Sequence, residues 1–150
     1  MKVLIPIILL LAACSQPAPV ARIAETPSGY PEAVFSGISA QKLADKFAVR
    51  CISKGHLIVV NTITQVKCEP RMTEENKNWA KAYIGNPYAD NIHHFLGYNL
   101  VEISRKIRVQ TREWIQLQMP YGQIKRHEMN SSEGFNQGIN ALYEMGGKPV

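Results

Sequence analysis

The stretch 107-IRVQTREWIQLQM-119 decides the fold, because apolar and polar side chains alternate along it. An alternation with a period of two residues is typical of a β-strand with one buried and one solvated face. The apolar face carries Ile107, Val109, Thr111, Ile115, Leu117 and Met119, and the polar face carries Arg108, Gln110, Arg112, Gln116 and Gln118. We therefore predict a long strand that covers a hydrophobic core.

Weaker patterns on both sides of this strand predict a mixed α and β domain. Capping residues indicate three helices, which start at Ser39, Thr73 and Asn130. The other predicted strands cover residues 33–35, 57–60, 63–68, 95–103 and 123–129. The resulting order is β-α-β-β-α-β-β-β-α. It indicates an α+β fold in which about three helices pack mainly on one face of an antiparallel sheet.

The start of the chain resembles the signal sequence of bacterial lipoproteins. A basic residue precedes an apolar run over residues 3–11, which is too short to span a bilayer, and Leu11-Ala12-Ala13-Cys14 matches the lipobox. The resemblance implies cleavage before Cys14, which would then carry a thioether-linked diacylglycerol and an amide-linked acyl chain such as palmitate. Ser15 in place of an aspartate implies the outer membrane. The alternative is an ordinary cleaved signal and a soluble periplasmic protein.

Three segments follow from this interpretation. Residues 1–13 are the signal peptide, residues 14–29 are the lipidated cysteine with a flexible tether rich in proline and alanine, and residues 30–150 are one periplasmic domain. The net charge of +5 falls to +4 once Lys2 is removed with the leader. Nucleic acid is excluded as a partner by the compartment. Another envelope protein or an anionic envelope component, such as lipid headgroups or peptidoglycan stems, remains a candidate partner.

The two remaining cysteines, Cys51 and Cys68, are an even set in an oxidising compartment. Cys51 falls on the apolar face of the first predicted helix, and Cys68 falls at the end of a predicted strand. We favour a disulfide that ties this helix to the sheet. The alternative is two buried free thiols, which behave as small hydrophobic side chains.

The polar face of the 107–119 strand is a candidate surface for a ligand or partner. Arg108, Arg112 and Trp114 lie among its glutamines, and Lys125 and Arg126 follow on the next strand across a tight turn. Arginine forks beside an aromatic ring suit an anionic or glycan-like ligand. The alternative is a solvated sheet face whose charges prevent edge-to-edge association.

Residues for catalysis or metal binding form no recognisable motif. His93 and His94, with Asp90 upstream and His56 and His127 elsewhere, are the cluster that comes nearest to a metal site. Adjacent residues of an extended chain point to opposite sides, so at most one of the histidine pair would face a given ion. The sequence has no GxSxG elbow and no cofactor-binding motif. We therefore expect no metal, no cofactor and no enzyme activity.

The mature part loosely resembles small envelope lipoproteins without an assigned activity, in Tyr30-Pro31-Glu32, Gly85-Asn86-Pro87-Tyr88, Trp114 and Tyr121-Gly122-Gln123. We expect a lipid-anchored envelope protein with a non-enzymatic binding or assembly role. One alternative is a prophage- or plasmid-type lipoprotein that interferes with an outer-membrane receptor. Another is a small envelope hydrolase, which a deep pocket joining a carboxylate to a histidine would favour. A flat basic sheet face would favour the binding protein.

Overall fold

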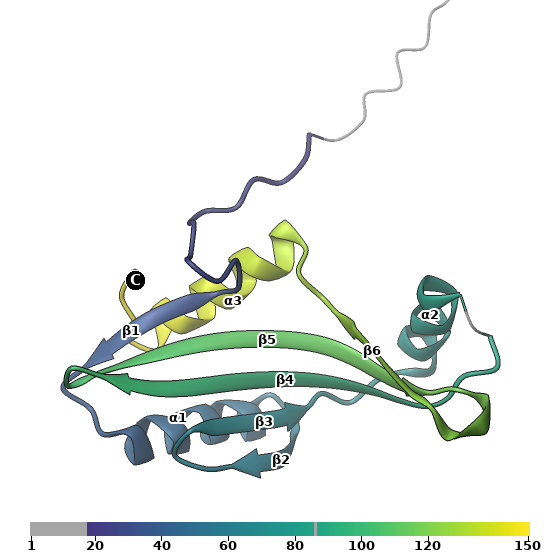
Figure 1. Ribbon diagram of the computed structural model, residues 1–150, viewed down its shortest axis with the longest axis horizontal. Helices are drawn as coiled ribbons and strands as arrows, with labels where there is room; N and C mark the ends of the chain where they lie inside the picture. The colour runs from purple at the N-terminus through teal and green to yellow at the C-terminus, as the bar shows by residue number, and fades with distance from the viewer. Residues whose placement is uncertain (1–17, 86) are drawn as a thin grey trace, which may run out of the picture.

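The computed structural model is an α+β fold built on a six-stranded antiparallel sheet (Figure 1). It describes residues 18–85 and 87–150, so the predicted signal sequence and Cys14 lie outside the described residues. The strands are β1 (Glu32–Ser36), β2 (Leu57–Asn61), β3 (Gln65–Glu69), β4 (Asp90–Ile103), β5 (Lys106–Gln118) and β6 (Ile124–Glu128). The helices are α1 (Ala40–Ser53), α2 (Glu74–Ile84), α3 (Ser132–Glu144) and a 3₁₀ turn, η1 (Pro120–Gly122). The predicted fold class and element order are confirmed.

Two long strands, β4 and β5, form the centre of the sheet. They are joined by a two-residue turn at Ser104 and Arg105, whose positive φ values of 49° and 64° suit a tight hairpin. β3 and then β2 follow on the free side of β4. The other side of β5 pairs with β1 along its first part and with β6 along its last part.

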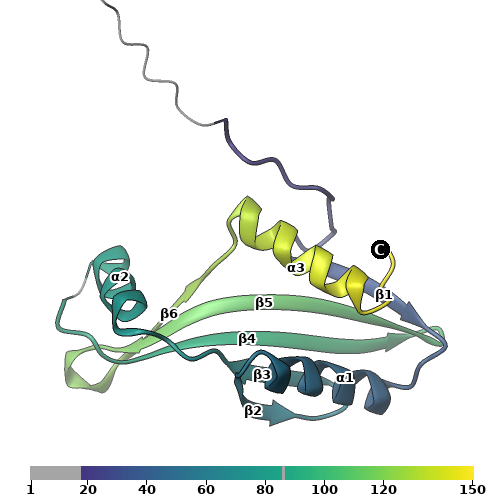
Figure 2. The same cartoon turned by 180° about the vertical axis from the view of Figure 1, so that it is seen from behind.

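The helices α1 and α3 lie on the same face of the sheet, one over β3 and the other over β1, as Figure 2 shows. The apolar face of β5 is buried beneath them at Ile107 and Val109, as its pattern predicts. Phe47 of α1 stacks on Tyr98 of β4, with ring centroids 4.3 Å apart. Leu142 of α3 belongs to the same core. The two helices therefore share one core but stand apart over the middle of β4 and β5.

The smaller helix α2 lies beside β6 (Figure 1). Its Trp79 stacks on Tyr83, and Tyr83 meets the ring of His127 on β6 edge to face. His127 is the register partner of Ile115, which is buried on the apolar face of β5. The helix thus packs on the same side of the sheet as α1 and α3.

Cys51 and Cys68 form a disulfide that joins α1 to β3, and their Cα atoms are 6.2 Å apart. This confirms the predicted bond. Both residues are buried in the core shared by the two elements. The bond therefore holds one side of the space between α1 and α3 in place.

Most predicted strand boundaries lie within two residues of the observed ones, and two differences, in β4 and α3, have a clear physical reason. β4 begins at Asp90 rather than at residue 95, because the polar His93 and His94 do not break the strand. Each is accommodated by a carboxylate on a neighbouring strand. The cap of α3 is Ser131 rather than Asn130, since the Ser131 hydroxyl accepts a hydrogen bond from the backbone N–H of Gly134.

The described part of the predicted tether, up to residue 29, makes specific contacts with the domain. Arg22 donates hydrogen bonds to Asn130 and lies over the ring of Phe135, 4.4 Å from its centroid. The backbone N–H of Ile23 donates to the side chain of Asn136. These contacts hold the segment against the beginning of α3. No helix in the described part of the chain is long and apolar enough to cross a bilayer.

Candidate binding site between α1 and α3

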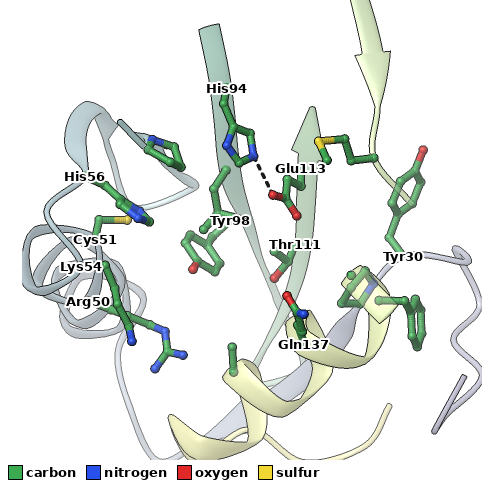
Figure 3. A pocket seen from close by; sticks show the side chains of 18 of the residues that line it. Tyr30, Arg50, Cys51, Lys54, His56, His94, Tyr98, Thr111, Glu113 and Gln137 are labelled. Carbon is green, nitrogen blue, oxygen red and sulfur yellow. Dashed lines mark hydrogen bonds and ion pairs between the residues drawn. The ribbon is translucent and has the colours of Figure 1, made fainter. Parts of the chain in front are cut away.

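A cavity of about 330 Å³ lies between α1 and α3, over the middle of β4 and β5 (Figure 3). Its apolar walls include Leu96 and Tyr98 from β4, Phe135 from α3 and Met129 from the loop before α3. The α3 wall also contains glycine and alanine, which leave room between the helix and the sheet. A concave site with apolar walls and a few converging polar groups is the usual form of a small-molecule site.

The polar floor of the cavity is a histidine paired with a carboxylate. Nε2 of His94 on β4 lies 2.6 Å from Oε1 of Glu113 on β5 (Figure 3). Glu113 occupies a position on the apolar face of β5, between Thr111 and Ile115. The Glu113 side chain is 34% exposed, so its carboxylate is only partly removed from water, and His94 is its partner on the neighbouring strand.

Sequence analysis missed this pair, although part of the signal was present. Glu113 is the charged residue at an otherwise apolar position in the alternation of the 107–119 stretch. A charge at a core position indicates either a functional group or a buried pair. Which histidine would face it depends on the register of β4 against β5, and the sequence did not give that register.

Two cations line the α1 side of the cavity, Arg50 on the last turn of the helix and Lys54 at its cap. Arg50 also lies beside Tyr98. Burial raises the pKa of the Tyr98 hydroxyl, although the charge and hydrogen bond of Arg50 act in the opposite direction. Among the described lining residues, Glu113 is the single carboxylate. This side of the cavity is therefore positively charged, whereas the α3 side carries the neutral amide of Gln137 (Figure 3).

Two polar atoms of the lining have no hydrogen-bond partner among the described residues, namely the hydroxyl of Thr111 and Nδ1 of His56. Thr111 is only 5% exposed, so its hydroxyl lacks protein partners and is also shielded from bulk water. Burial is the main cause that lowers the pKa of His56; His94 and Lys54 act in the same direction and Glu113 in the opposite one, so the neutral form of His56 is favoured. Three more buried atoms without a partner in the described part of the chain, in Arg112, Trp114 and Glu128, lie on the other face of the sheet, so the unpartnered atoms alone do not distinguish the cavity.

The predicted partner surface on the opposite face of the sheet is only partly assembled. Arg112 and Arg126 both pair with Glu128, at 3.1 and 2.7 Å, and Arg126 also covers the ring of Trp114, 3.9 Å from its centroid. Arg112 lies over the ring of Tyr30. Trp114 is only 6% exposed, because Arg126 and the neighbouring strands cover it. The indole is thus unavailable for stacking on a ligand in this arrangement.

Arg108 and Lys125 do not join that group. Arg108 lies six residues from Trp114 along β5 and pairs with Glu32 of β1. Burial alone would raise the pKa of Glu32, but hydrogen bonds from Ser28, Arg108 and Gln110 and the charge of Arg108 lower it overall. Lys125 is the register partner of Leu117 and so belongs to the opposite face from Arg126. The five residues therefore do not form one surface.

The adjacent histidines of β4 point to opposite sides of the sheet, as the alternation of a strand requires. Nδ1 of His93 lies 2.5 Å from Oε1 of Glu69, on the other face from the His94 pair. The described residues contain no group of three or more side chains arranged to hold a metal ion. His93 and His94 therefore belong to two separate pairs.

Comparison with known proteins yields no relative: no family model, no curated protein and no solved structure matches this chain.

Proposed function

We propose that this chain is a lipid-anchored envelope protein with a binding role, held on the outer membrane through acylated Cys14. The cavity between α1 and α3 is its site for a small ligand. The observation that carries the proposal is a mostly apolar cavity of about 330 Å³ in which a few polar groups converge, namely Arg50, Lys54 and the His94–Glu113 pair. Such a combination of apolar walls and a few polar groups is typical of a small-molecule site.

The lining favours binding over covalent catalysis. Cys51 contributes to the cavity wall, but its sulfur is committed to the disulfide. The Thr111 hydroxyl is not hydrogen-bonded to a base within the described structure, and an activated nucleophile needs such a contact. Neither group is therefore prepared for nucleophilic attack.

One observation supports a second candidate, a small hydrolase. The cavity joins a carboxylate to a histidine, and the Glu113–His94 pair has the composition of a general base that activates water. Hydrolysis of a chromogenic ester or amide that is lost in Glu113→Gln, and retained when the similar pair on the other face is changed by Glu69→Gln, would favour this candidate. Absence of turnover in the wild type would leave the binding role.

Filling the cavity tests the binding role. Ala141 of α3 lines the cavity, whereas Asn140 is exposed on the same helix. Native mass spectrometry of protein extracted from its own envelope should show a bound small molecule in the wild type and in the matched control Asn140→Phe. Ala141→Phe should lose it. Equal spectra for the two variants, or no bound species in the wild type, would contradict the proposal.

The anchor is tested separately by metabolic labelling with a radioactive fatty acid. Label should enter the wild type and the Cys51→Ser/Cys68→Ser variant, and it should be absent from Cys14→Ser. Label that persists in Cys14→Ser, or an unlabelled wild type, would overturn the lipid anchor. The cavity-binding proposal does not depend on this outcome.

A further inference from the structure

The charges around the cavity are distributed unevenly. Both cations, Arg50 and Lys54, come from α1 and its cap, while the described lining of the α3 side carries none. A molecule that enters between the helices therefore meets positive charge on one side and apolar or neutral groups on the other. Such a cavity matches a ligand that is itself asymmetric, with a charged end and an apolar body.

Neither cation is held in a buried ion pair, although Arg50 also forms a hydrogen bond with the Tyr98 hydroxyl in the cavity. Arg50 pairs with Glu144 at 3.2 Å, but the Glu144 side chain is 66% exposed. Exposed pairs of this kind contribute little, so Arg50 can exchange that partner for a ligand. Lys54 makes no ion pair with the described residues. Both side chains are thus available to an incoming negative group.

The carboxylate of the lining does not cancel this charge. Glu113 lies on the sheet and is held 2.6 Å from His94, a contact that occupies one of its oxygens. It lies opposite the helix that bears the cations (Figure 3). A negative ligand group at Arg50 and Lys54 would therefore have two cations beside it, and the carboxylate would lie toward the floor of the cavity.

The volume limits the apolar body. An engineered apolar cavity of about 150 Å³ binds benzene, and the present cavity of about 330 Å³ is roughly twice that size. A chain of about eight carbons or a two-ring body is of a suitable size by the same comparison. Tyr98, Leu96 and Phe135 supply apolar surface for it.

Building on the proposed binding function, we propose that the ligand is a small amphiphilic anion. Its negative group lies between Arg50 and Lys54, and its apolar body extends along Tyr98 toward Phe135. The negative group is a carboxylate or a phosphate, which arginine and lysine recognise alike as charges. A free fatty acid and a short phosphorylated lipid share this chemistry.

A matched set of ligands separates charge from apolar contact. Isothermal titration of the whole mature chain, carrying Cys14→Ser so that no detergent is needed, would compare octanoate, octyl phosphate, octanol and octylamine below their aggregation limits. Octanoate or octyl phosphate should bind about 10-fold or more tighter than octanol, since a hydrogen bond to a charged group is stronger than one between neutral groups. Octylamine should bind most weakly. The tighter of the two anions identifies the headgroup and hence the source.

Substitution of the two cations tests whether they cause the preference for an anionic ligand. Arg50→Gln/Lys54→Gln should reduce the affinity for the anion to that for octanol and leave octanol binding unchanged. The control Lys42→Gln/Lys46→Gln removes two cations from exposed positions of the same helix, outside the cavity, and should have no effect.

The outcomes separate this inference from the function on which it depends. Octanol or octylamine binding as tightly as octanoate and octyl phosphate would overturn the anionic ligand and leave the cavity as a binding site. An unaltered anion preference in the Arg50→Gln/Lys54→Gln variant would do the same. Failure of all four compounds to bind would count against both this inference and the proposed function.

Discussion

Thr111→Val should stabilise the unliganded protein. The side chain is 5% exposed and its hydroxyl has no hydrogen-bond partner among the described residues, so folding removes the hydroxyl from water without compensation. An unsatisfied buried group of this kind costs about 1–3 kcal/mol. Valine keeps nearly the same shape and replaces the hydroxyl by a methyl group. We therefore expect the free energy of unfolding to rise by about 1–2 kcal/mol, the lower half of that range.

Urea unfolding followed by tryptophan fluorescence measures this change as a higher midpoint with an unchanged slope. Thr62→Val is the matched control, because the exposed Thr62 hydroxyl accepts from the backbone N–H of Gln65 at 3.0 Å and contacts its carbonyl at 3.2 Å. That variant should lose about 0.5–1.5 kcal/mol. If Thr111→Val also lowered the free energy of unfolding, the Thr111 hydroxyl would have a partner in the folded protein. Thr111 would then not be an unsatisfied buried group of the cavity lining.

Three further predictions concern the disulfide, the sheet and pH. Reducing Cys51–Cys68, or replacing both residues by alanine, should lower the free energy of unfolding by about 3 kcal/mol, given the separation of 17 residues; equal urea midpoints with and without reductant would contradict this. Gly97→Ala places a methyl group 3.0 Å from the ring of Trp114 and should cost about 1–3 kcal/mol, with altered tryptophan fluorescence; an unchanged midpoint and spectrum would show that the ring can move. Because burial lowers the pKa of His56 below its ordinary value of 6.5, the unfolded chain binds more protons than the folded chain as the pH falls below 6.5, and stability is lost over that range. His56→Gln should lose less stability than the wild type between pH 7.5 and pH 5, and parallel curves would contradict this assignment.

The fold was predictable because its signals are local. The alternation from Ile107 to Leu117 defines the face of the central strand that the helices cover. Ser39 and Thr73 each accept a hydrogen bond from the third residue of the chain after them, as a helix cap does. The start of β4 was missed because His93 and His94 resemble loop residues when their partners on other strands are unknown.

The candidate site was not predictable in the same way, because it is assembled from residues far apart in the chain. Glu113 meets His94 only through the register of β4 and β5, and this pair shares a cavity with Arg50 only because α1 packs on that face. The five residues of the predicted partner surface do not lie together for the same reason. Lys125 and Arg126 are neighbours in sequence, yet the pleat places them on opposite faces.

The contact of Arg22 with Asn130 and Phe135 has a consequence for how far the domain can stand from a bilayer. Arg22 is eight residues after Cys14, and eight residues span at most about 28 Å even when fully stretched. If Cys14 is acylated as proposed, the contact of Arg22 with Asn130 and Phe135 would keep the cavity wall formed by Phe135 close to the lipid headgroups. With that proposed anchor, losing the Arg22 contact would free more of the segment between Cys14 and the domain, and the domain could then lie farther from the bilayer with its cavity unchanged.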